Sequence, residues 1–393
     1  MSLQKTPNAN RLHIGIFGKV NSGKSTLMNA LTGQKVALVS KEKGTTTDPV
    51  YKAMELHGIG PVVFIDTAGF NDTSILGNKR MSKKIEVSKK VDLAIIVCAE
   101  DTIDEEFIWY SRFKQANVTV LLVVNDMGTN NAPVIALKLK ETVKETIIVS
   151  NFLERREIDK IKEAVVNNTP NEQEITITRD LVKENDIVLL VMPQDMQAPK
   201  GRLILPQVQT IRELLDKMCV VISCTTDSMD NAIQSLNTPP KLIICDSQVF
   251  KTVYERKPQS SRLTSFSILF AGYKGDMDAF IKGVKKLQTL NESSRILIAE
   301  ACTHAPMNED IGRVKIPRLL RKRFGQLSIE IVSGSDFPPD LTAYDLIIHC
   351  GACMFNRKYV ISRVTEAKEQ GVAITNYGIT LAYLQGILEY ISW

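Results

Sequence analysis

One short segment limits the fold of this chain more than any other. Residues 18–25 read Gly-Lys-Val-Asn-Ser-Gly-Lys-Ser and fit the phosphate-binding pattern G-x-x-x-x-G-K-[ST]. An apolar run at 12–17 precedes the segment, and a helical pattern at 25–31 follows it. In that order, backbone amides and a helix N-terminus face phosphate oxygens. We therefore predict a nucleotide site in which Lys24 reaches the β- and γ-phosphates and Ser25 binds magnesium. The alternative is a loop that binds nothing.

The rest of the chain alternates short apolar runs with segments of helical periodicity, which is the pattern of βαβ units. This pattern predicts an α/β fold, with a P-loop domain followed by two further α/β domains that have mainly parallel sheets. Polar stretches at 167–172 and 256–262 suggest domains at 1–170, 171–262 and 263–393. The predicted strands are 12–17, 62–66, 93–98, 118–124, 146–149, 187–192, 219–223, 242–245, 266–270, 296–300, 328–332, 345–349 and 372–375. One predicted helix carries Val208, Ile211, Leu214 and Leu215 on one face, and another covers 379–390.

Composition narrows the class of protein. The 393 residues carry a net charge of +5, the polar segment 1–10 lacks the apolar centre of a signal peptide, and no apolar run approaches the roughly 20 residues of a membrane span. The seven cysteines are therefore interpreted as thiols, ligands or core residues in a cytoplasmic protein. The basic run 318–323 is expected to be a solvated helix face, with docking of an acidic partner as the alternative. Only Phe324 adds an aromatic ring near it, so nucleic-acid binding is not expected.

Further polar residues follow the phosphate loop in an order that suits a nucleotide switch. The loop Thr45–Thr46–Thr47 supplies a hydroxyl that can close over magnesium, and Asp66-Thr67-Ala68-Gly69 ends an apolar strand. The carboxylate of Asp66 suits a magnesium-bound water, and the amide of Gly69 suits the γ-phosphate. Asn125 and Ser150 end two later strands, where a base would lie.

This succession resembles the G domain of the TrmE–Era branch of GTPases, over roughly residues 10–168. The phosphate loop with Asn21 inside it and the triplet Gly44-Thr45-Thr46 carry the resemblance. It implies GTP or GDP as ligand, GTP hydrolysis, and a potassium ion held by Asn21. The implied catalytic residues are Lys24, Thr46, Asp66 and Gly69, and the implied magnesium ligands are Ser25, Thr46 and Asp66. The implied nucleotide contacts are Asn21, Ser22, Gly23, Lys24, Ser25, Thr26, Asn125, Asp126 and Ser150.

Two positions depart from the pattern of that branch. The base-reading motif N-K-x-D is here Asn125-Asp126-Met127-Gly128, so glycine stands where a carboxylate would accept two hydrogen bonds from guanine. Asp126 can substitute only after a local shift. Phe70 occupies the position where many GTPases carry a water-positioning glutamine. An apolar side chain cannot orient the attacking water, so we expect slow hydrolysis.

The C-terminal third carries a second kind of site. Cys302-Thr303-His304 follows the strand at 296–300, and His349-Cys350-Gly351-Ala352-Cys353 ends the strand at 345–349. If these strands are neighbours, their carboxyl ends bring Cys302, Cys350 and Cys353 together. Three thiolates with one open position suit a 4Fe-4S cluster. A Cys₃His zinc site with His304 or His349 fits the same spacing, and a redox dithiol or buried core cysteines are further alternatives.

The G domain, the middle α/β segment and the C-x-H…H-C-x-x-C pattern together resemble the HydF family of FeFe-hydrogenase maturation GTPases, over essentially the whole chain. The resemblance implies nucleotide-binding, dimerisation and 4Fe-4S cluster-binding domains in a homodimer. Cys302, Cys350 and Cys353 would hold the cluster, with His304 or His349 as fourth ligand or hydrogen-bonding neighbour. The implied role is a scaffold and carrier that receives a di-iron subcluster precursor from HydE and HydG and delivers it to apo-hydrogenase HydA. The rival functions are an RNA-modifying GTPase with a zinc-stabilised C-terminal domain and a redox enzyme that uses Cys350 and Cys353.

Overall fold

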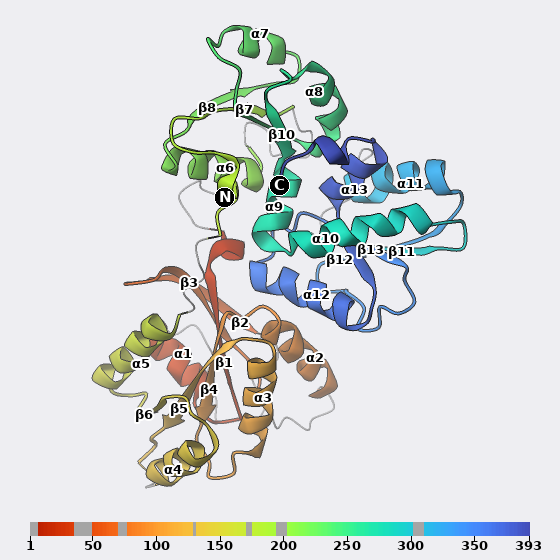
Figure 1. The fold of residues 1–393 in the computed structure, drawn as a ribbon. Helices are drawn as coiled ribbons and strands as arrows, with labels where there is room; N and C mark the ends of the chain where they lie inside the picture. The colour runs from red at the N-terminus through yellow and green to blue at the C-terminus, as the bar shows by residue number, and fades with distance from the viewer. Residues whose placement is uncertain are drawn as a thin grey trace. The chain divides into compact units, whose positions relative to one another are not determined.

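The computed structural model divides the chain into two compact units, residues 1–172 and 173–393 (Figure 1). The described residues are 7–34, 49–69, 77–128, 131–169, 175–193, 203–301 and 310–393, with the side chains of 77–80 left out.

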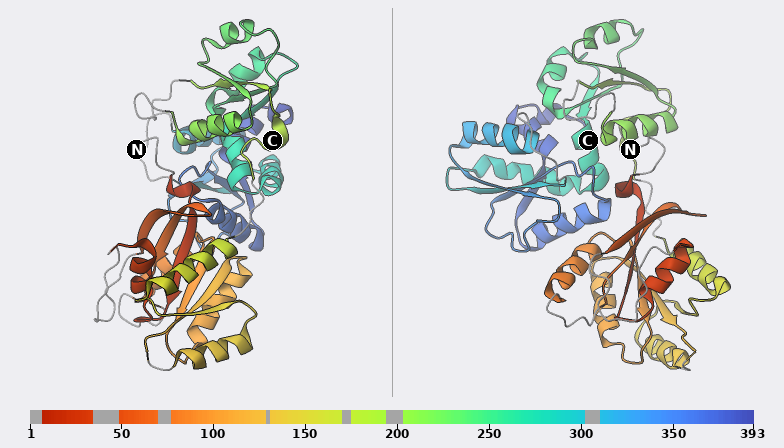
Figure 2. Two further views of the ribbon diagram at one scale, coloured as in Figure 1. Left: turned by 90° about the vertical axis from the view of Figure 1, so that its left-hand side faces the viewer. Right: turned by 180° about the vertical axis from the view of Figure 1, so that it is seen from behind.

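The first unit is a six-stranded sheet with helices on both faces (Figures 1 and 2). The strand order is β2-β3-β1-β4-β5-β6, and every pair is parallel except β2 with β3. The strands are β1 (Leu12–Gly18), β2 (Val50–Leu56), β3 (Gly60–Asp66), β4 (Leu93–Cys98), β5 (Thr119–Asn125) and β6 (Ile147–Ser150). The helices are α1 (Lys24–Thr32), α2 (Gly77–Ser88), α3 (Asp104–Gln115), α4 (Ala132–Thr142) and α5 (Arg155–Asn168).

The two faces of this sheet are covered by different helices. Apolar side chains of α2, α3 and α4 pack on one face, including Val87, Trp109 and Ile135. Those of α1 and α5 pack on the other, including Leu27 and Ile161. Parallel strands that are buried on both faces need this three-layer arrangement. It places the carboxyl ends of β1, β3, β4, β5 and β6 at one edge, where the predicted nucleotide residues lie.

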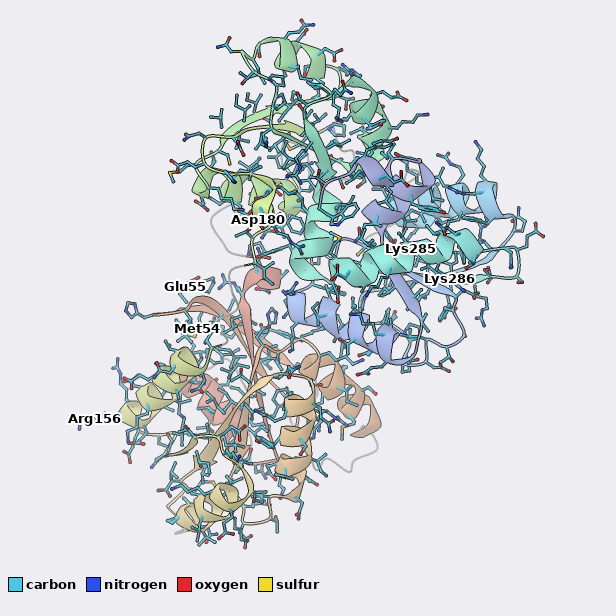
Figure 3. The ribbon with its side chains drawn as sticks, viewed as in Figure 1. Met54, Glu55, Arg156, Asp180, Lys285 and Lys286 are labelled. Atoms are coloured by element: carbon cyan, nitrogen blue, oxygen red, sulfur yellow. The ribbon has the colours of Figure 1, made fainter. Side chains whose placement is uncertain are left out.

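The five strands predicted for this unit are confirmed, but β2 was not predicted. Its residues alternate between half-buried and exposed along the strand, as in Met54 and Glu55 (Figure 3). An edge strand with one solvated face alternates in this way. Lys52 stands at a half-buried position of β2, so the inward face carries no uninterrupted apolar set that a sequence pattern would reveal.

The second unit contains two four-stranded parallel sheets, with strand orders β10-β9-β7-β8 and β12-β11-β13-β14. One hydrophobic cluster runs through both, from Leu189 in the first sheet to Ile348 in the second. The strands are β7 (Ile187–Val191), β8 (Val220–Cys224), β9 (Leu242–Cys245), β10 (Arg262–Ser265), β11 (Arg295–Glu300), β12 (Ser328–Ser333), β13 (Leu346–His349) and β14 (Ala373–Asn376).

Helices surround these two sheets (Figure 2). They are α6 (Leu205–Asp216), α7 (Met229–Gln234), α8 (Phe250–Arg256), α9 (Phe266–Lys274), α10 (Met277–Val284), α11 (Ile316–Phe324), α12 (Arg357–Glu369) and α13 (Tyr377–Leu384). Short 3₁₀ turns lie at Asn8–Asn10, Arg179–Leu181, Ser247–Val249, Lys285–Thr289 and Leu388–Tyr390, and a π-helical turn lies at Ile311–Lys315.

Three expectations for this unit are wrong. The predicted strand at 266–270 is the start of helix α9, which is capped by the Ser265 hydroxyl accepting from the Ile268 amide at 3.3 Å. The strand lies just before it, as β10, and pairs with β9 in the middle sheet. The predicted helix at 379–390 ends at Leu384, because Gly386 adopts a left-handed conformation (φ 73°). Leu215, predicted on the buried face of α6, is 46 % exposed.

Candidate functional site

The phosphate loop bends sharply between β1 and α1. Asn21 and Gly23 have positive φ angles of 63° and 98°. The φ angle of Gly23 favours glycine, and a Cβ there would also lie 2.4 Å from the side-chain Nδ2 of Asn125. In this closed loop, the buried Lys24 ammonium donates to the carbonyl of Lys19 at 2.5 Å. Burial lowers the pKa of Lys24 to about 8, although Asp66 acts against this.

Ser25 and Asp66 form the centre of the predicted magnesium site. The Ser25 hydroxyl donates to Oδ2 of Asp66 at 2.6 Å. The Asp66 side chain is fully buried, and its Oδ1 has no hydrogen-bond partner in the described structure. Burial raises the pKa of Asp66, and the Ser25 hydrogen bond and the Lys24 charge oppose that rise. A buried, unsatisfied carboxylate oxygen beside a hydroxyl oxygen is the donor set that magnesium prefers, so these residues fit the ion.

Gly69 lies against the phosphate loop, next to Val20. A Cβ at this position would sit 2.4 Å from the backbone nitrogen of Val20, so the two backbones can approach only because residue 69 is glycine. The ammonium of Lys84, on α2, is buried and donates to the Gly69 carbonyl at 2.5 Å. Sequence reasoning missed Lys84, since a lysine within a charged helix gives no sign that it points inward.

The residues predicted to read the base are brought together at the ends of β5 and β6. Asn125 donates through Nδ2 to the Ser22 carbonyl at 3.0 Å, and the Asp126 amide donates to the Ser150 carbonyl at 2.9 Å. The Asp126 carboxylate accepts from the amide of Gly128 at 3.0 Å, which closes a short turn. Ser150 is buried. One oxygen of Asp126, the only carboxylate of the stretch Asn125–Gly128, is therefore engaged within its own turn.

Lys19 connects the phosphate loop to the start of α3. Its buried ammonium donates to the carbonyl of Thr102 and, at 2.9 Å, to the hydroxyl of the same residue. Carboxylates of Glu106 and Glu100 lie 3.7 Å and 3.5 Å away. Burial raises the pKa of Glu106 to about 6, and Lys19 opposes that rise. None of these contacts was predicted.

Part of each predicted site lies outside the described residues. For the nucleotide site, this concerns the Thr45–Thr46–Thr47 loop with Gly44, and Phe70. For the cysteine site, it concerns Cys302, Thr303 and His304.

The two strands that precede the cysteine motifs are neighbours, which meets the condition set for the cysteines to meet at one edge. β11 and β13 pair in parallel with Ala299 opposite His349. The Cys350 sulfur accepts hydrogen bonds from the amides of Ala301, at 3.0 Å, and Ala352, at 3.3 Å. Burial raises the pKa of Cys350 to about 11, and the two amides and the charge of Arg363 oppose that rise. Amide donors aimed at one sulfur favour its thiolate form and its use as a metal ligand.

His349 occupies the last position of β13, with its side chain fully buried. Its Nδ1 lies 2.9 Å from the Cys350 carbonyl, and its Nε2 lies 3.2 Å from Nη1 of Arg363. Burial, reinforced by the Arg363 charge, lowers the pKa of His349 to about 3. Both ring nitrogens are thus engaged by protein groups.

A lysine from the middle of the unit holds the cysteine turn. The buried Lys274 ammonium, at the end of α9, donates to the carbonyls of Ala352, Cys353 and Phe355, at 3.2, 3.3 and 2.6 Å. In return, Arg357 donates to the carbonyls of Tyr273 and Gly275, at 2.8 and 3.1 Å. Within the described ranges, no three His, Cys, Asp or Glu side chains are grouped as a complete metal site. Cys350 and Cys353 supply two thiol donors that fit a thiolate-bound cluster or zinc.

A protein with this loop, this sheet order and these appended sheets is a P-loop GTPase with further α/β domains on its C-terminal side. Family models agree with that class. Residues 13–126 match the 50S ribosome-binding GTPase model, 177–275 the hydrogen maturase F dimerization domain, and 278–391 the hydrogen maturase F tetramerization domain. The chain belongs to the hydrogen maturase F (HydF) family of hydrogenase maturation GTPases. The two hydrogen maturase F models describe a dimerization and a tetramerization domain, so they support an oligomeric protein.

Two curated proteins that match are GTPases, and each match covers less than half of this chain. The GTPase Der of Nautilia profundicola is 29% identical over 188 residues, which cover 44% of this chain and 41% of that protein. The tRNA modification GTPase MnmE of Bartonella henselae is 47% identical over 88 residues, covering 21% and 19%. The chain thus spans less than half the length of these relatives.

Solved structures give only a weak likeness. A point variant of Era from Aquifex aeolicus, bound to GDP.AlF4-, is 18% identical with a TM-score of 0.37, covering 57% of this chain and 98% of that one. Among the described helices, none has the length and apolar character needed to cross a membrane.

Proposed function

We propose that this protein is an FeFe-hydrogenase maturation factor that binds GTP and holds a 4Fe-4S cluster through Cys302, Cys350 and Cys353. The observation that carries the proposal is the pair of amides donating to the Cys350 sulfur, within the region matched by a hydrogen maturase F model. When bound, the cluster offers an open iron to which a di-iron subcluster precursor can attach. The cargo would come from HydE and HydG and pass to apo-hydrogenase HydA in the cytoplasm.

The domain roles follow from the same proposal. Residues 1–170 bind and hydrolyse GTP. The middle domain, expected at 171–262, forms the dimer and extends through β10 and α9. The rest of the chain holds the cluster, with His304 or His349 as fourth ligand or hydrogen-bonding neighbour. GTP and magnesium would be bound with the help of Ser25, Thr46 and Asp66. Hydrolysis would change how the cluster domain is presented to a partner.

The GTPase reaction is expected to be slow and stimulated by potassium. Water attacks the γ-phosphorus, the bond to the β,γ-bridging oxygen breaks, and Lys24 neutralises the charge on the phosphates. Phe70 offers no group to orient that water, and Asn21 would hold a potassium ion that adds positive charge. Hydrolysis rates measured in potassium and in sodium test this point, and equal rates would remove potassium from the proposal.

The first experiment is iron and sulfide analysis of protein purified without oxygen, together with an EPR spectrum after dithionite reduction. We expect about four irons per chain, as a 4Fe-4S cluster requires, and loss of the signal in Cys350→Ser. Cys219→Ser, which removes a buried cysteine of the other sheet, is the matched control and should keep its iron. Transfer to apo-hydrogenase would then be tested on the same samples.

The rival with a specific observation in its favour is an RNA-modifying GTPase with structural zinc, because the tRNA modification GTPase MnmE is among the proteins similar to part of this chain. Stoichiometric zinc, no iron after reconstitution, and salt-dependent RNA binding would favour that rival. The redox-enzyme rival predicts activity without metal and a Cys302→Ser variant that stays active.

A further inference from the structure

Arg363, on α12, is a charged side chain in an apolar enclosure. The residue is only 1% exposed. The rings of Phe337, Phe355 and Tyr359 each lie 4.7 Å from its guanidinium carbon. Its Nη2 donates to the carbonyl of Gly334, and its Nε has no hydrogen-bond partner in the described part of the chain. Arginine keeps its charge inside proteins, so this enclosure holds a permanent cation.

The described residues place no carboxylate in an ion pair with Arg363, although another arginine of this unit has one. The half-buried Arg313, for comparison, contacts the Glu300 carboxylate at 2.9 Å. Burying a cation without a counter-charge is unfavourable, and proteins avoid it unless an anion is bound nearby. The aromatic rings offset part of that penalty, but they leave the charge itself unbalanced.

His349 connects Arg363 to the cysteine turn. An arginine nitrogen can only donate a hydrogen bond, so Nε2 of His349, 3.2 Å from Nη1 of Arg363, must accept. The ring proton of the neutral imidazole is then on Nδ1, which donates to the Cys350 carbonyl at 2.9 Å. Arg363 therefore fixes the tautomer of His349, and His349 orients the peptide unit of Cys350.

From these contacts we propose that Arg363 is a positioning residue that balances the negative charge of a thiolate-bound cluster at Cys350 and sets its reduction potential. The proposal rests on the proposed function, because the cluster is its anion. Two consequences follow. The positive charge favours the reduced, more negative state of the cluster, and His349 is a hydrogen-bonding neighbour of the cluster site, with neither ring nitrogen available to iron.

The test is a redox titration of the reconstituted protein, followed by EPR. Arg363→Gln and Arg363→Met remove the charge, one keeping a polar group and the other an apolar chain. Each should disfavour reduction about tenfold, which moves the potential of a one-electron couple by about 59 mV to more negative values. Arg363→Lys keeps the charge and should stay near the wild-type potential. Lys368→Met removes a charge from the same helix, but from an exposed pair with Asp276, and should leave the potential unchanged.

The outcomes separate this inference from the proposed function. If the wild-type protein takes up no iron, the proposed function fails and the inference fails with it. If the wild type holds a cluster and the neutral variants have the same reduction potential as the wild type, only the role of Arg363 is overturned. A lysine variant that behaves like the glutamine variant would also overturn the charge argument.

A second measurement covers the case in which the neutral variants do not fold. In protein labelled with ¹⁵N-histidine, the nitrogen couplings of the reduced cluster should be the same with and without His349→Gln. Loss of a coupling in that variant would show an iron bond to His349 and would overturn the orientation deduced above.

Discussion

The hydroxyl of Ser25 and the carboxylate of Asp66 are joined by a 2.6 Å hydrogen bond although they are 41 residues apart in sequence. Ser25 lies on α1, directly after the phosphate loop, and Asp66 is the last residue of β3. The pair thus connects the carboxyl ends of two neighbouring parallel strands, β1 and β3. Oδ1 of Asp66, which has no hydrogen-bond partner in the described structure, leaves an oxygen available to a cation.

Ser25→Ala should abolish the effect of magnesium on nucleotide binding. Removing one ligand oxygen and the hydrogen bond to Asp66 should weaken GDP binding in magnesium about tenfold or more, roughly the effect of one charge-assisted hydrogen bond. In EDTA the variant and the wild type should bind alike. Titration with a fluorescent GDP measures both conditions. Thr32→Ala removes a hydroxyl from the other end of α1, where it contacts the Met28 carbonyl, and should keep the full magnesium effect.

Glu106 should make the GTPase domain less stable as pH rises through the weakly acidic range. Its pKa is raised from 4.5 to about 6 by burial, so the folded state keeps its proton where the unfolded chain has lost it. The free energy of unfolding therefore falls between pH 4.5 and 6, by about 2 kcal/mol in total. Glu106→Gln should lack this fall, whereas Glu100→Gln, at an exposed carboxylate near the same lysine, should retain it.

Trp109, which is buried and lies on α3 like Glu106, can report the unfolding of wild type and variants in urea. The measurement is cleanest in a Trp393→Phe background, since these are the two tryptophans of the chain. Parallel pH profiles for wild type and Glu106→Gln would contradict the assignment.

Lys274→Met should loosen the cysteine turn. Three carbonyls lose their common donor, and buried acceptors left without a partner destabilise a fold by roughly 1–3 kcal/mol each before relaxation. We expect a clear loss of thermal stability in the second unit and a lower iron content after reconstitution. Lys282→Met, at an exposed position of α10, should stay within about 0.5 kcal/mol of wild type. An iron content equal to that of the wild type would show that the turn keeps its shape without Lys274.

Val220→Asp should weaken self-association. Val220 is 51 % exposed on β8, the last strand of its sheet, and Leu215 and Met218 are exposed directly before it. An unpaired strand edge with apolar neighbours is a surface suited to another copy of the same strand, within the region matched by the dimerization model. Light scattering should show a smaller species than for the wild type. Leu137→Asp, at an exposed apolar position of α4 in the first unit, is the control and should not change the mass.

The sequence was sufficient to predict the position of candidate site residues where polar residues follow strongly apolar strands. Asp66, Asn125 and Ser150 were predicted from strand ends, and the structure brings them to one edge of the sheet. For Cys350 the same reasoning was conditional on two strands being neighbours, and the parallel pairing of β11 with β13 meets that condition. The sequence predicted a strand instead of a helix at 266–270, because α9 is buried on nearly all sides. Such a helix has no amphipathic period to distinguish it from a strand.

The buried cations could not be predicted. Lys84, Lys274 and Arg363 look like ordinary charged residues in the sequence, and only the tertiary structure shows that they point into the protein. The bonds of Lys274 span about eighty positions, and nothing local to Lys274 or to the cysteine turn indicates them. Charged side chains are mostly exposed, so the default interpretation of any lysine or arginine is a solvated one.

The reciprocal contacts of Lys274 and Arg357 also bear on how this architecture can be inherited or recombined. The dimerization model ends at residue 275 and the tetramerization model begins at 278, so the boundary between them falls directly after α9. If one module were exchanged between relatives, the Lys274 ammonium of the first module would lose the carbonyls that it contacts in the second. The Arg357 guanidinium of the second module would likewise lose the carbonyls that it contacts in the first. A chimera joined at this boundary would need matched partners for both Lys274 and Arg357. The two modules should therefore be inherited together.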